Sequence, residues 1–308
     1  DCYTNCYKVA GVLRDYCNMA VYGGRVCVNQ KYIKTMLEGR FGDFDGVSLY
    51  PSAIYRLCIE RGLPAGPAYK MEDFRKWSTY NYSIMTVKIT AVNKKQQMPM
   101  IAVKTKNGIN YTNDVPEENM VIDSTTLEDY IKFHHIEYKI LDGVYWNIGT
   151  SNMAELVKNL FNERVNIKKK AGGDTALSNV IKLMLNSAYG KTLIKKTRKT
   201  TKFLDYSLYN DFIVNNFENI YGFRKLNDKQ YEVEITEIDS SFNRVHIGAS
   251  VLSMSRRIMN EVFDVCNTHN LPIYYTDTDS IHLNYDDTKI LAEKYREEYG
   301  RELEGKDL

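Results

Sequence analysis

Two apolar stripes that flank a pair of glycines constrain the fold of this chain more than any other feature. Residues 153–161 and 177–188 repeat apolar side chains every three or four positions, a spacing that gathers them on one face of an α-helix. Between the two segments, Ala171-Gly172-Gly173-Asp174 interrupts the helical pattern. We therefore predict an antiparallel helical hairpin. Its inward stripes are Met153, Leu156, Val157, Leu160 and Phe161 on the first helix and Leu177, Ile181, Met184 and Ala188 on the second.

Helices and strands are mixed along the rest of the chain. Residues 81–93 alternate apolar and polar side chains, which predicts a half-buried strand, and residues 138–146 and 231–238 are further strand candidates. Residues 246–270 have a long helical pattern that ends before Pro272, with Arg256 and Arg257 predicted on its outer side. A strand, a turn and a second strand are predicted over residues 273–283.

Composition limits the class of protein. The 308 residues suit one large domain with insertions or two to three modules, and they show neither a long apolar run nor a charged, apolar leader. We therefore expect a soluble, intracellular protein without a membrane partner. The six cysteines show no spacing that completes a zinc site, which favours reduced thiols. The net charge is only +2, so a nucleic-acid footprint would be local, and residues 191–202 hold six basic residues and no acidic one.

Asp277-Thr278-Asp279 is the first candidate for catalysis. In an extended segment alternate side chains share a face, so we expect both carboxylates to project the same way. Two neighbouring carboxylates repel each other and stay ionised at neutral pH when a cation lies between them, and Mg²⁺ prefers such oxygen ligands. The alternative is an ordinary solvated turn, in which acidic residues are common.

A third carboxylate favours the catalytic interpretation. Asp45 ends a predicted strand just before Ser48-Leu49-Tyr50-Pro51, where it could meet the other two in space. Three acidic side chains on a sheet can hold two divalent cations about 4 Å apart, as in phosphoryl transfer. Asp43 is the competing residue and is expected to be structural. Because proline restricts the residue before it, Tyr50 is expected to be extended.

The helical hairpin supplies positive charge. Lys182, Asn186 and Tyr189 are spaced i, i+4, i+7, so they share one helical face beside the apolar one. Arg164 and residues 168–170, which are all lysine, come near the turn at the end of the first helix. Such lysines could offset the charge of a nucleoside triphosphate, whereas lysines on a solvated helix end would only complement the helix dipole. For Lys169 both interpretations stay open.

Three motifs give the chain a family resemblance. Asp45-Gly-Val-Ser48-Leu-Tyr50-Pro51 resembles motif A of the family B DNA polymerases, D-x-x-S-L-Y-P. Lys182-Leu-Met-Leu-Asn186-Ser187-Ala-Tyr189-Gly190 resembles motif B, and Tyr275-Thr-Asp277-Thr-Asp279-Ser280 resembles motif C. They occur in the family's order, and the resemblance spans residues 20–308. It implies an α+β fold: a polymerase palm, which is an antiparallel sheet with packed helices, together with helical fingers and two insertions.

The resemblance also divides the chain. It implies a palm that begins with residues 1–60, continues through residues 61–150 with a first insertion, and ends with residues 246–308. Residues 151–191 would be the fingers, and residues 192–245 a second insertion. These insertions resemble those of the protein-primed branch of phages, viruses and linear plasmids, where one contacts the priming protein and the other encircles DNA. Exonuclease and thumb domains are expected to be absent.

The activity that the resemblance implies is metal-dependent DNA synthesis. A primer 3′-hydroxyl, or a protein hydroxyl in protein priming, would attack a deoxynucleoside triphosphate with the help of two divalent cations, Mg²⁺ or alternatively Mn²⁺. The implied partners are template-primer DNA, dNTPs and, with protein priming, a terminal protein. The alternative function is a DNA-binding remnant without competent catalysis, against which the intact Asp45, Asp277, Asp279 and Lys182 argue.

The resemblance assigns roles to particular residues. The catalytic and metal-binding residues would be Asp45, Asp277 and Asp279, with Gly46 beside the metals. The nucleotide-binding residues would be Ser48, Leu49, Tyr50, Lys168, Lys170, Lys182, Asn186 and Tyr189, with Tyr50 under the incoming sugar. The DNA-binding residues would be Tyr22, Gly23, Gly24, Ser52, Ser187, Gly190, Lys191, Lys195, Lys196 and Lys199.

A glycine pair near the start of the chain resembles the Y-x-G-G element of the protein-primed branch. Val21 stands where that element has its tyrosine, and Tyr22 follows one place later. Gly23 and Gly24 are expected to supply either positive φ angles or a close approach of the backbone.

Overall fold

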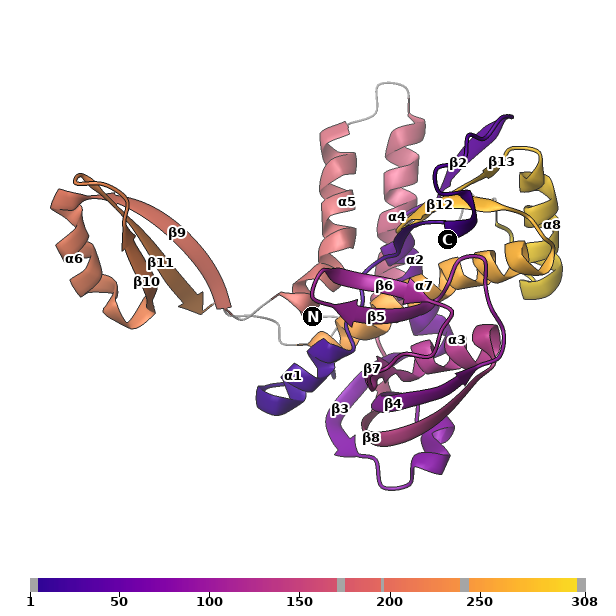
Figure 1. The fold of residues 1–308 in the computed structure, drawn as a ribbon, viewed down its shortest axis with the longest axis horizontal. Coiled ribbons are helices and arrows are strands. Elements are labelled where there is room, and N and C mark those ends of the chain that lie inside the picture. Colours follow the sequence, from indigo (N-terminus) through magenta and orange to yellow (C-terminus); the bar gives the residue numbers. More distant parts are fainter. Residues whose placement is uncertain (1–4, 171–174, 195–196, 239–243, 304–308) are drawn as a thin grey trace. The chain divides into compact units, whose positions relative to one another are not determined.

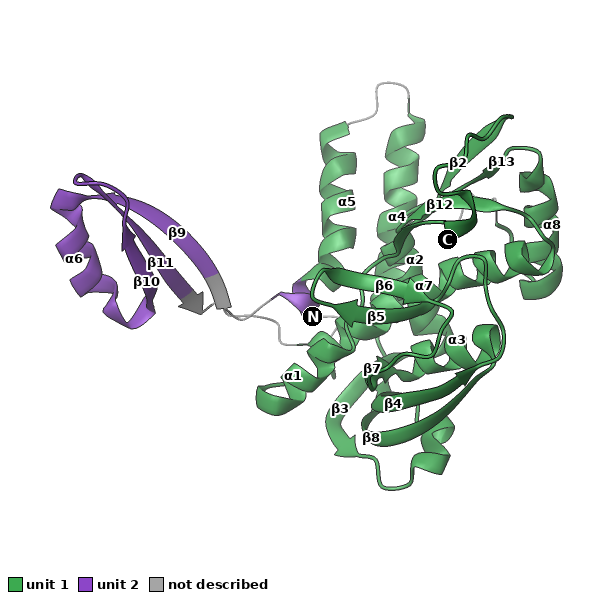
Figure 2. Ribbon diagram, in the orientation of Figure 1, with its two compact units in different colours: residues 1–190, 244–308 green, residues 191–243 purple. Residues whose placement is uncertain are grey.

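The computed structural model describes residues 5–170, 175–194, 197–238 and 244–303 (Figure 1). The chain forms two compact units, residues 1–190 with 244–308 and residues 191–243, which have different colours in Figure 2. The helices of the first unit are α1 (Gly11–Met19), α2 (Leu49–Glu60), α3 (Ser124–His134), α4 (Met153–Lys169), α5 (Thr175–Gly190), α7 (Val245–Thr268) and α8 (Asp287–Tyr299).

The sheet that carries motifs A and C is antiparallel and has the strand order β1-β12-β13-β2; we call it the motif sheet. Its strands are β1 (Val26–Val28), β12 (Ile273–Asp277), β13 (Ser280–Asn284) and β2 (Phe41–Asp45). One face is apolar and packs against α7 and α8, where Ile273, Ile281 and Leu283 join Phe263 and Leu291 in one core. The acidic residues Asp45 and Asp277 lie on the opposite face.

A second antiparallel sheet, ordered β3-β8-β4-β7, packs against α3. Its strands are β3 (Leu63–Lys70), β4 (Tyr82–Val92), β7 (Met120–Asp123) and β8 (Ile136–Gly149), and a separate hairpin joins β5 (Ile101–Thr105) to β6 (Gly108–Thr112). Met85, Val87 and Ile89 of β4 are buried, as their alternation predicts. All pairings between these strands are antiparallel, which together with the packed helices confirms the predicted α+β class.

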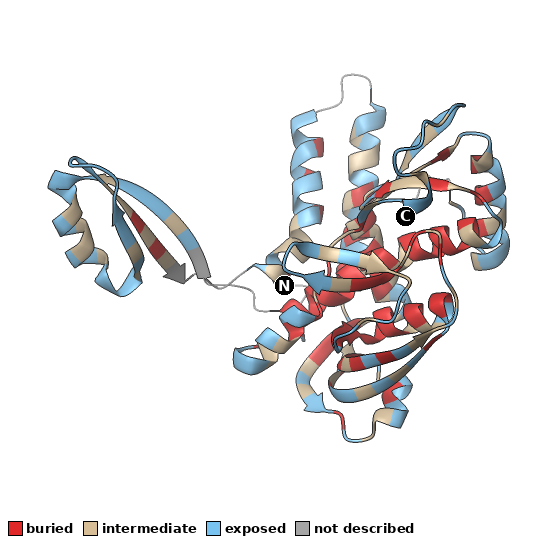
Figure 3. Ribbon diagram, viewed as in Figure 1, coloured by how far each residue is buried: buried red, intermediate tan, exposed pale blue. Residues whose placement is uncertain are grey.

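α7 is buried on nearly all sides, and this corrects one prediction (Figure 3). Arg256 is only 8% exposed and Arg257 is nearly buried, although both were predicted on the outer side. The Nε group of Arg257 donates to Asp129 at 2.6 Å, and a terminal nitrogen of Arg256 donates to the Thr126 hydroxyl at 3.0 Å. The polar side of α7 thus meets polar groups of α3 instead of water.

The predicted helical hairpin is present as α4 and α5, which lie side by side in Figure 1. Its inward stripes differ from the prediction. Met153, Val157, Phe161 and Ile181 are buried as predicted, but Leu156, Leu177 and Met184 are exposed, and Leu185 is buried. A helical period of 3.6 residues fits neighbouring stripes almost equally well. Packing on α2 and α7 selects the stripe that is buried.

The described part of the second unit is a small three-stranded antiparallel sheet, ordered β10-β11-β9, with the α-helix α6. Its elements are β9 (Thr197–Asp205), α6 (Tyr206–Asn216), β10 (Ile220–Lys225) and β11 (Gln230–Ile238). Val233 and Ile235 of β11 are buried, and Tyr209 of α6 stacks on Tyr231 with 3.9 Å between ring centroids. In neither unit is a described helix both long and apolar enough to cross a membrane.

Two buried histidines make the stability of the first unit depend on pH. His246 stacks on Trp146 with 5.0 Å between ring centroids, and neither ring nitrogen has a hydrogen-bond partner among the described residues. Burial, and then the charge of Arg244, lower the pKa of His246 to about 3, and burial lowers the pKa of His134 to about 4. An unfolded histidine titrates near pH 6.5, so below that pH the unfolded chain binds protons that the native chain does not.

We predict that the melting temperature falls as the pH is lowered from about 6.5 to about 4, and that His246→Phe weakens this dependence. Phenylalanine keeps the stack on Trp146 and removes one proton taken up on unfolding, which is worth about 1.4 kcal/mol per pH unit. Calorimetry over this pH range measures the effect, with exposed His269→Phe as the matched control. Equal slopes for the His246 variant and the wild type would contradict the interpretation.

Candidate active site

The register of the motif sheet places residues of motifs A and C in one row. Asp45 of β2 lies opposite Ser280 of β13, and Ser280 lies opposite Asp277 of β12. Residues that face each other across an antiparallel pair project from the same face of the sheet. In the neighbouring positions, Phe44, Ile281 and Thr276 oppose one another and belong to the buried face. The two carboxylates therefore project from the face that α7 leaves free.

A turn positions Asp279 at the site, instead of the predicted extended segment. Thr278 has a left-handed conformation with φ of 57°, and the Asp279 N–H donates to the Asp277 carbonyl at 2.6 Å. The chain therefore turns at Thr278-Asp279, and the prediction that both aspartates share one extended segment is wrong. Asp279 nevertheless lies beside motif A, because the Gly46 N–H donates to the Asp279 carbonyl at 2.6 Å.

The electrostatics of Asp279 depend more on Asp45 than on Asp277. Burial raises the pKa of Asp279 above its ordinary value; the negative charge of Asp45 contributes next, and that of Asp277 less. The Asp277 carboxylate accepts a hydrogen bond from the Thr278 hydroxyl at 3.1 Å. Across the described ranges, no group of three or more histidine, cysteine or acidic side chains could hold a metal ion. Among the predicted carboxylates, Asp279 is thus influenced most by Asp45.

Motif A continues into the first turn of α2. Ser48 caps this helix with φ of 52°, and Tyr50 is helical, so the prediction of an extended Tyr50 is wrong. Proline is tolerated in a first helical turn because the N–H that it lacks has no intrahelical partner there. The preference of the residue before proline for an extended backbone is overridden here by the start of α2. α2 begins four residues after Asp45, and the free N–H groups of its first turn are of the kind that bind anions.

Tyr50 connects motif A to motif B. Its ring stacks on that of Tyr189, which lies near the end of α5, with 4.4 Å between centroids and 26° between planes. Burial, and then the neighbouring Tyr189, raise the pKa of Tyr50 to about 12. The two stacked rings thus link the first turn of α2 to the last turn of α5. Lys182 and Asn186 are exposed on α5 and lie two turns and one turn, respectively, before Tyr189.

The first helix of the hairpin contributes an arginine that sequence reasoning undervalued. A terminal nitrogen of Arg164 donates to the Ser48 hydroxyl at 3.3 Å, and its buried Nε has no partner within the described chain. Lys168 and Lys170 lie farther along α4 and at its end, and both are exposed. The spacing i, i+4 between Arg164 and Lys168 was the available signal, because it places both cations on one side of the helix.

The predicted DNA-binding residues have mixed surroundings. Tyr22 is only 3% exposed, and Lys104 and Arg256 lie over its ring, so a DNA contact by this ring would require the core to open. Neither Gly23 nor Gly24 has a positive φ angle, so of the two predicted reasons for glycine only close approach remains.

The remaining predicted DNA contacts lie on α2, on α5 and in the second unit. The Ser52 hydroxyl donates to the Val47 carbonyl at 3.2 Å, while Ser187 and Gly190 are half-buried on α5. Lys191 is exposed, and the amine of Lys199 lies 3.3 Å from the centroid of the Tyr221 ring. Lys195 and Lys196 lie outside the described residues.

Comparison with known proteins places this geometry in a family. Residues 4–267 match the family described as DNA polymerase type B, organellar and viral. The chain belongs to this family. A search of curated proteins by sequence gave no match.

Solved structures of Phi29 DNA polymerase are similar in fold to this family member. The ternary complex with primer-template DNA and incoming nucleotide substrates has a TM-score of 0.65 at 21% identity, over 92% of this chain and 45% of that one. The binary complex with primer-template DNA has a TM-score of 0.64 at 22% identity, over 92% and 44%. The chain thus spans less than half the length of these polymerases. At this identity the likeness shows the shared fold.

We predict that Asp45→Asn or Asp279→Asn lowers nucleotide addition at least about 10²-fold, because each change removes a charge that a phosphoryl-transfer site needs. DNA affinity, measured by gel shift, should stay within about twofold, because neither carboxylate attracts phosphate. Asp43→Asn is the matched control: Asp43 lies two positions before Asp45 in β2 and pairs with His282 at 3.3 Å. Wild-type rates in either first variant would contradict the assignment.

Proposed function

We propose that this chain carries the polymerising site of a DNA-directed DNA polymerase. The observation that supports this most is the approach of Asp279, at the turn before β13, to Asp45 at the end of β2, together with the stack of Tyr50 on Tyr189. The reaction is the attack of a primer 3′-oxygen on the α-phosphate of a dNTP, which forms a phosphodiester bond and releases pyrophosphate.

The two carboxylates suit the metal ions that such a reaction uses. Burial and mutual repulsion raise the pKa of Asp279, and a cation beside Asp45 and Asp279 would relieve this repulsion. Asp45 and Asp279 would hold two divalent cations, Mg²⁺ or alternatively Mn²⁺, with Asp277 assisting. When bound, these cations neutralise charge on the phosphates. The Gly46 N–H fixes the main chain of Asp279, so the carboxylates keep their positions.

The hairpin residues supply the contacts to the nucleotide. Lys168, Lys170 and Lys182 would bind the triphosphate together with the first N–H groups of α2 at Ser48 and Leu49. We add Arg164, which already contacts Ser48. Asn186 and Tyr189 would frame the nascent base pair, and Tyr50 would lie beneath the sugar.

Template-primer DNA would pass over the motif sheet and the hairpin. Ser52, Ser187, Gly190 and Gly23 would approach the strands, and Lys191, Lys195, Lys196 and Lys199 would contact phosphates. We assign α4 and α5 to the fingers and the second unit to the second insertion. We further propose that the enzyme is replicative and protein-primed, with the first insertion within residues 61–150 contacting a terminal protein.

Primer extension by the full-length polypeptide tests the proposal. Template-primer DNA, dNTPs and Mg²⁺ should give extension that Asp279→Asn removes. DNA binding without extension would instead support the alternative of a non-catalytic remnant. Extension that starts on a protein hydroxyl, detected as labelled nucleotide bound to protein, would support protein priming, whereas use of DNA primers alone would contradict it.

We predict that Tyr50→Val increases the use of ribonucleotides selectively. A deoxyribose fits against the Tyr50 ring, whereas a 2′-hydroxyl would collide with it or be buried unpaired, at a cost of about 1–3 kcal/mol. The ratio of kcat/KM for matched deoxy- and ribonucleotides should therefore fall about tenfold or more in the variant. If both substrates lose efficiency equally, Tyr50 is a core residue and the sugar is read elsewhere.

We predict that Arg164→Met raises the KM for dNTPs about tenfold or more, because a hydrogen bond to a charged group contributes about 1.5–3 kcal/mol. Methionine keeps most of the apolar packing and loses the charge. Lys158→Met is the matched control, since Lys158 is an exposed cation on the same helix. Steady-state kinetics with a saturating primer-template separates the outcomes. Similar KM values for Arg164→Met and Lys158→Met would refute a triphosphate contact.

A further inference from the structure

The turn that carries Asp279 is held by main-chain hydrogen bonds on two sides. On one side the Thr278 N–H donates to the Arg25 carbonyl at 2.7 Å, just beyond the pairing of β1 with β12. On the other side the Gly46 N–H donates to the Asp279 carbonyl. Thr278 itself has φ of 57°, a conformation that a β-branched residue adopts only where its surroundings enforce it.

The backbone at Gly24 lies very close to the side chain of Thr278. A Cβ atom at Gly24 would lie 2.6 Å from Cγ2, 2.7 Å from Oγ1 and 2.9 Å from Cβ of Thr278. No side chain fits at such distances, so Gly24 is needed for the close approach of the segment before β1 to the turn. A Cβ at the neighbouring Gly23 would meet nothing within 4 Å. A side chain is therefore excluded at position 24 but has space at position 23.

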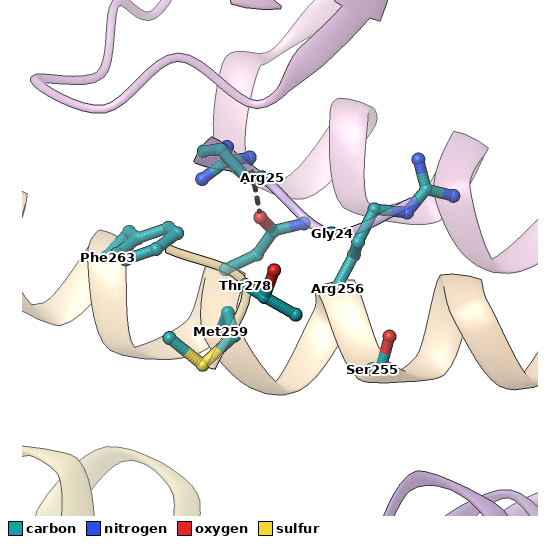
Figure 4. A pocket seen from close by; sticks show the side chains of 8 residues that line it. Gly24, Arg25, Ser255, Arg256, Met259, Phe263 and Thr278 are labelled. Carbon is teal, nitrogen blue, oxygen red and sulfur yellow. Dashed lines mark hydrogen bonds between the residues drawn. The ribbon is translucent and has the colours of Figure 1, made fainter. Parts of the chain in front are cut away.

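Arg25 anchors the segment that holds the turn. Its guanidinium is buried between the rings of Tyr111 and Phe263, at 4.6 and 4.7 Å from their centroids. One terminal nitrogen donates to the Asn260 side-chain oxygen at 3.1 Å, a bond drawn in Figure 4. Asn260 in turn donates to Asp129 at 2.9 Å. The Arg25 carbonyl that receives the Thr278 N–H is thus fixed through its own side chain to α7.

The space behind the turn is not filled by side chains. A small pocket lies between Thr278 and α7, lined by Gly24, Arg25, Ser255, Arg256 and Met259 among others (Figure 4). Thr278 borders this pocket, so α7 does not enclose the turn completely on that side. The position of the turn depends instead on Gly24, Arg25 and Gly46.

We propose that Gly24 and Arg25 are positioning residues for catalysis: they hold Thr278 so that Asp279 lies beside Asp45. This inference rests on the proposed function, because it takes the Asp45–Asp279 pair as the reacting site. It assigns Gly24 a role different from the DNA contact that the family resemblance implies. By this role, displacement of the turn lowers the rate of the chemical step and leaves primer-template affinity unchanged.

The test is a double-mutant cycle in the full-length polypeptide. Gly24→Ala should lower kcat about 10²-fold, because a misplacement of about 1 Å at a reacting group has an effect of this size. The KM for dNTPs and the Kd for primer-template should stay within about twofold. Thr278→Gly removes all three atoms that a Cβ at position 24 would meet, so the double variant Gly24→Ala, Thr278→Gly should recover at least about tenfold in kcat.

Arg25→Met and Gly23→Ala complete the set of variants. Methionine keeps contact with Phe263 and Tyr111 but loses the bond to Asn260, so kcat should fall about tenfold. Gly23→Ala adds a methyl group without a clash and reports whether this turn approaches DNA. If both glycine variants weaken DNA binding equally and leave kcat unchanged, the glycines serve DNA and the proposal is overturned. The proposal is also overturned if the loss of kcat in the double variant equals the product of the losses in the two single variants.

Amide hydrogen exchange gives a measurement that does not depend on activity. The Thr278 N–H is bonded to Arg25 in the native chain, so Gly24→Ala should speed exchange in peptides that cover residues 277–280. Thr278→Gly in the double variant should restore slow exchange, and unchanged exchange in Gly24→Ala would refute the positioning role. A wild-type protein that extends no primer would refute the proposed function, whereas this measurement would still decide whether Gly24 holds the turn.

Discussion

Burial of one face of the motif sheet is the constraint on which the site depends. β2 and β13 belong to motifs that lie more than 200 residues apart in the sequence, and nothing local brings them together. The apolar side chains of Phe44 and Ile281 oppose each other on the face that packs against α7. A slip of one residue would exchange the faces of a strand and bury Asp45. The hydrophobic pattern between the motif residues therefore fixes the position of the carboxylates.

α7 can pack against this sheet and still be buried on nearly all sides, because its polar side chains have partners inside the protein. Arg257 pairs with Asp129, and Glu261 pairs with Arg56 at 2.6 Å and accepts a hydrogen bond from Tyr295 at 3.1 Å. A buried charge without its partner would be strongly destabilising, so these pairs specify which helix lies against which side of α7. The same helix holds Asn260, through which Arg25 is anchored. The core and the site are thus stabilised by one set of contacts.

The sequence was sufficient where a feature is local or where spacing alone decides it. The helical hairpin, the strand at 82–92, the hairpin around Thr278 and the α+β class all follow from periodicity and from the three motifs. Prediction was wrong where tertiary packing decides between local alternatives. Arg256 is inside because α3 supplies polar partners, and Leu185 replaces Met184 because α2 and α7 select the stripe. Arg164 was undervalued because its partner Ser48 is distant in sequence.

Two strained residues show how the site combines conformation with chemistry. Ser48 and Thr278 have φ angles of 52° and 57°, a region in which glycine would avoid a cost of about 1 kcal/mol or more for each residue. Each hydroxyl has a partner in the site: Ser48 accepts from Arg164, and Thr278 donates to Asp277. Glycine at either position would fit the backbone and lose that bond. The strain is therefore located where a side chain forms a hydrogen bond with a charged group, and the sheet and the helix on either side sustain it.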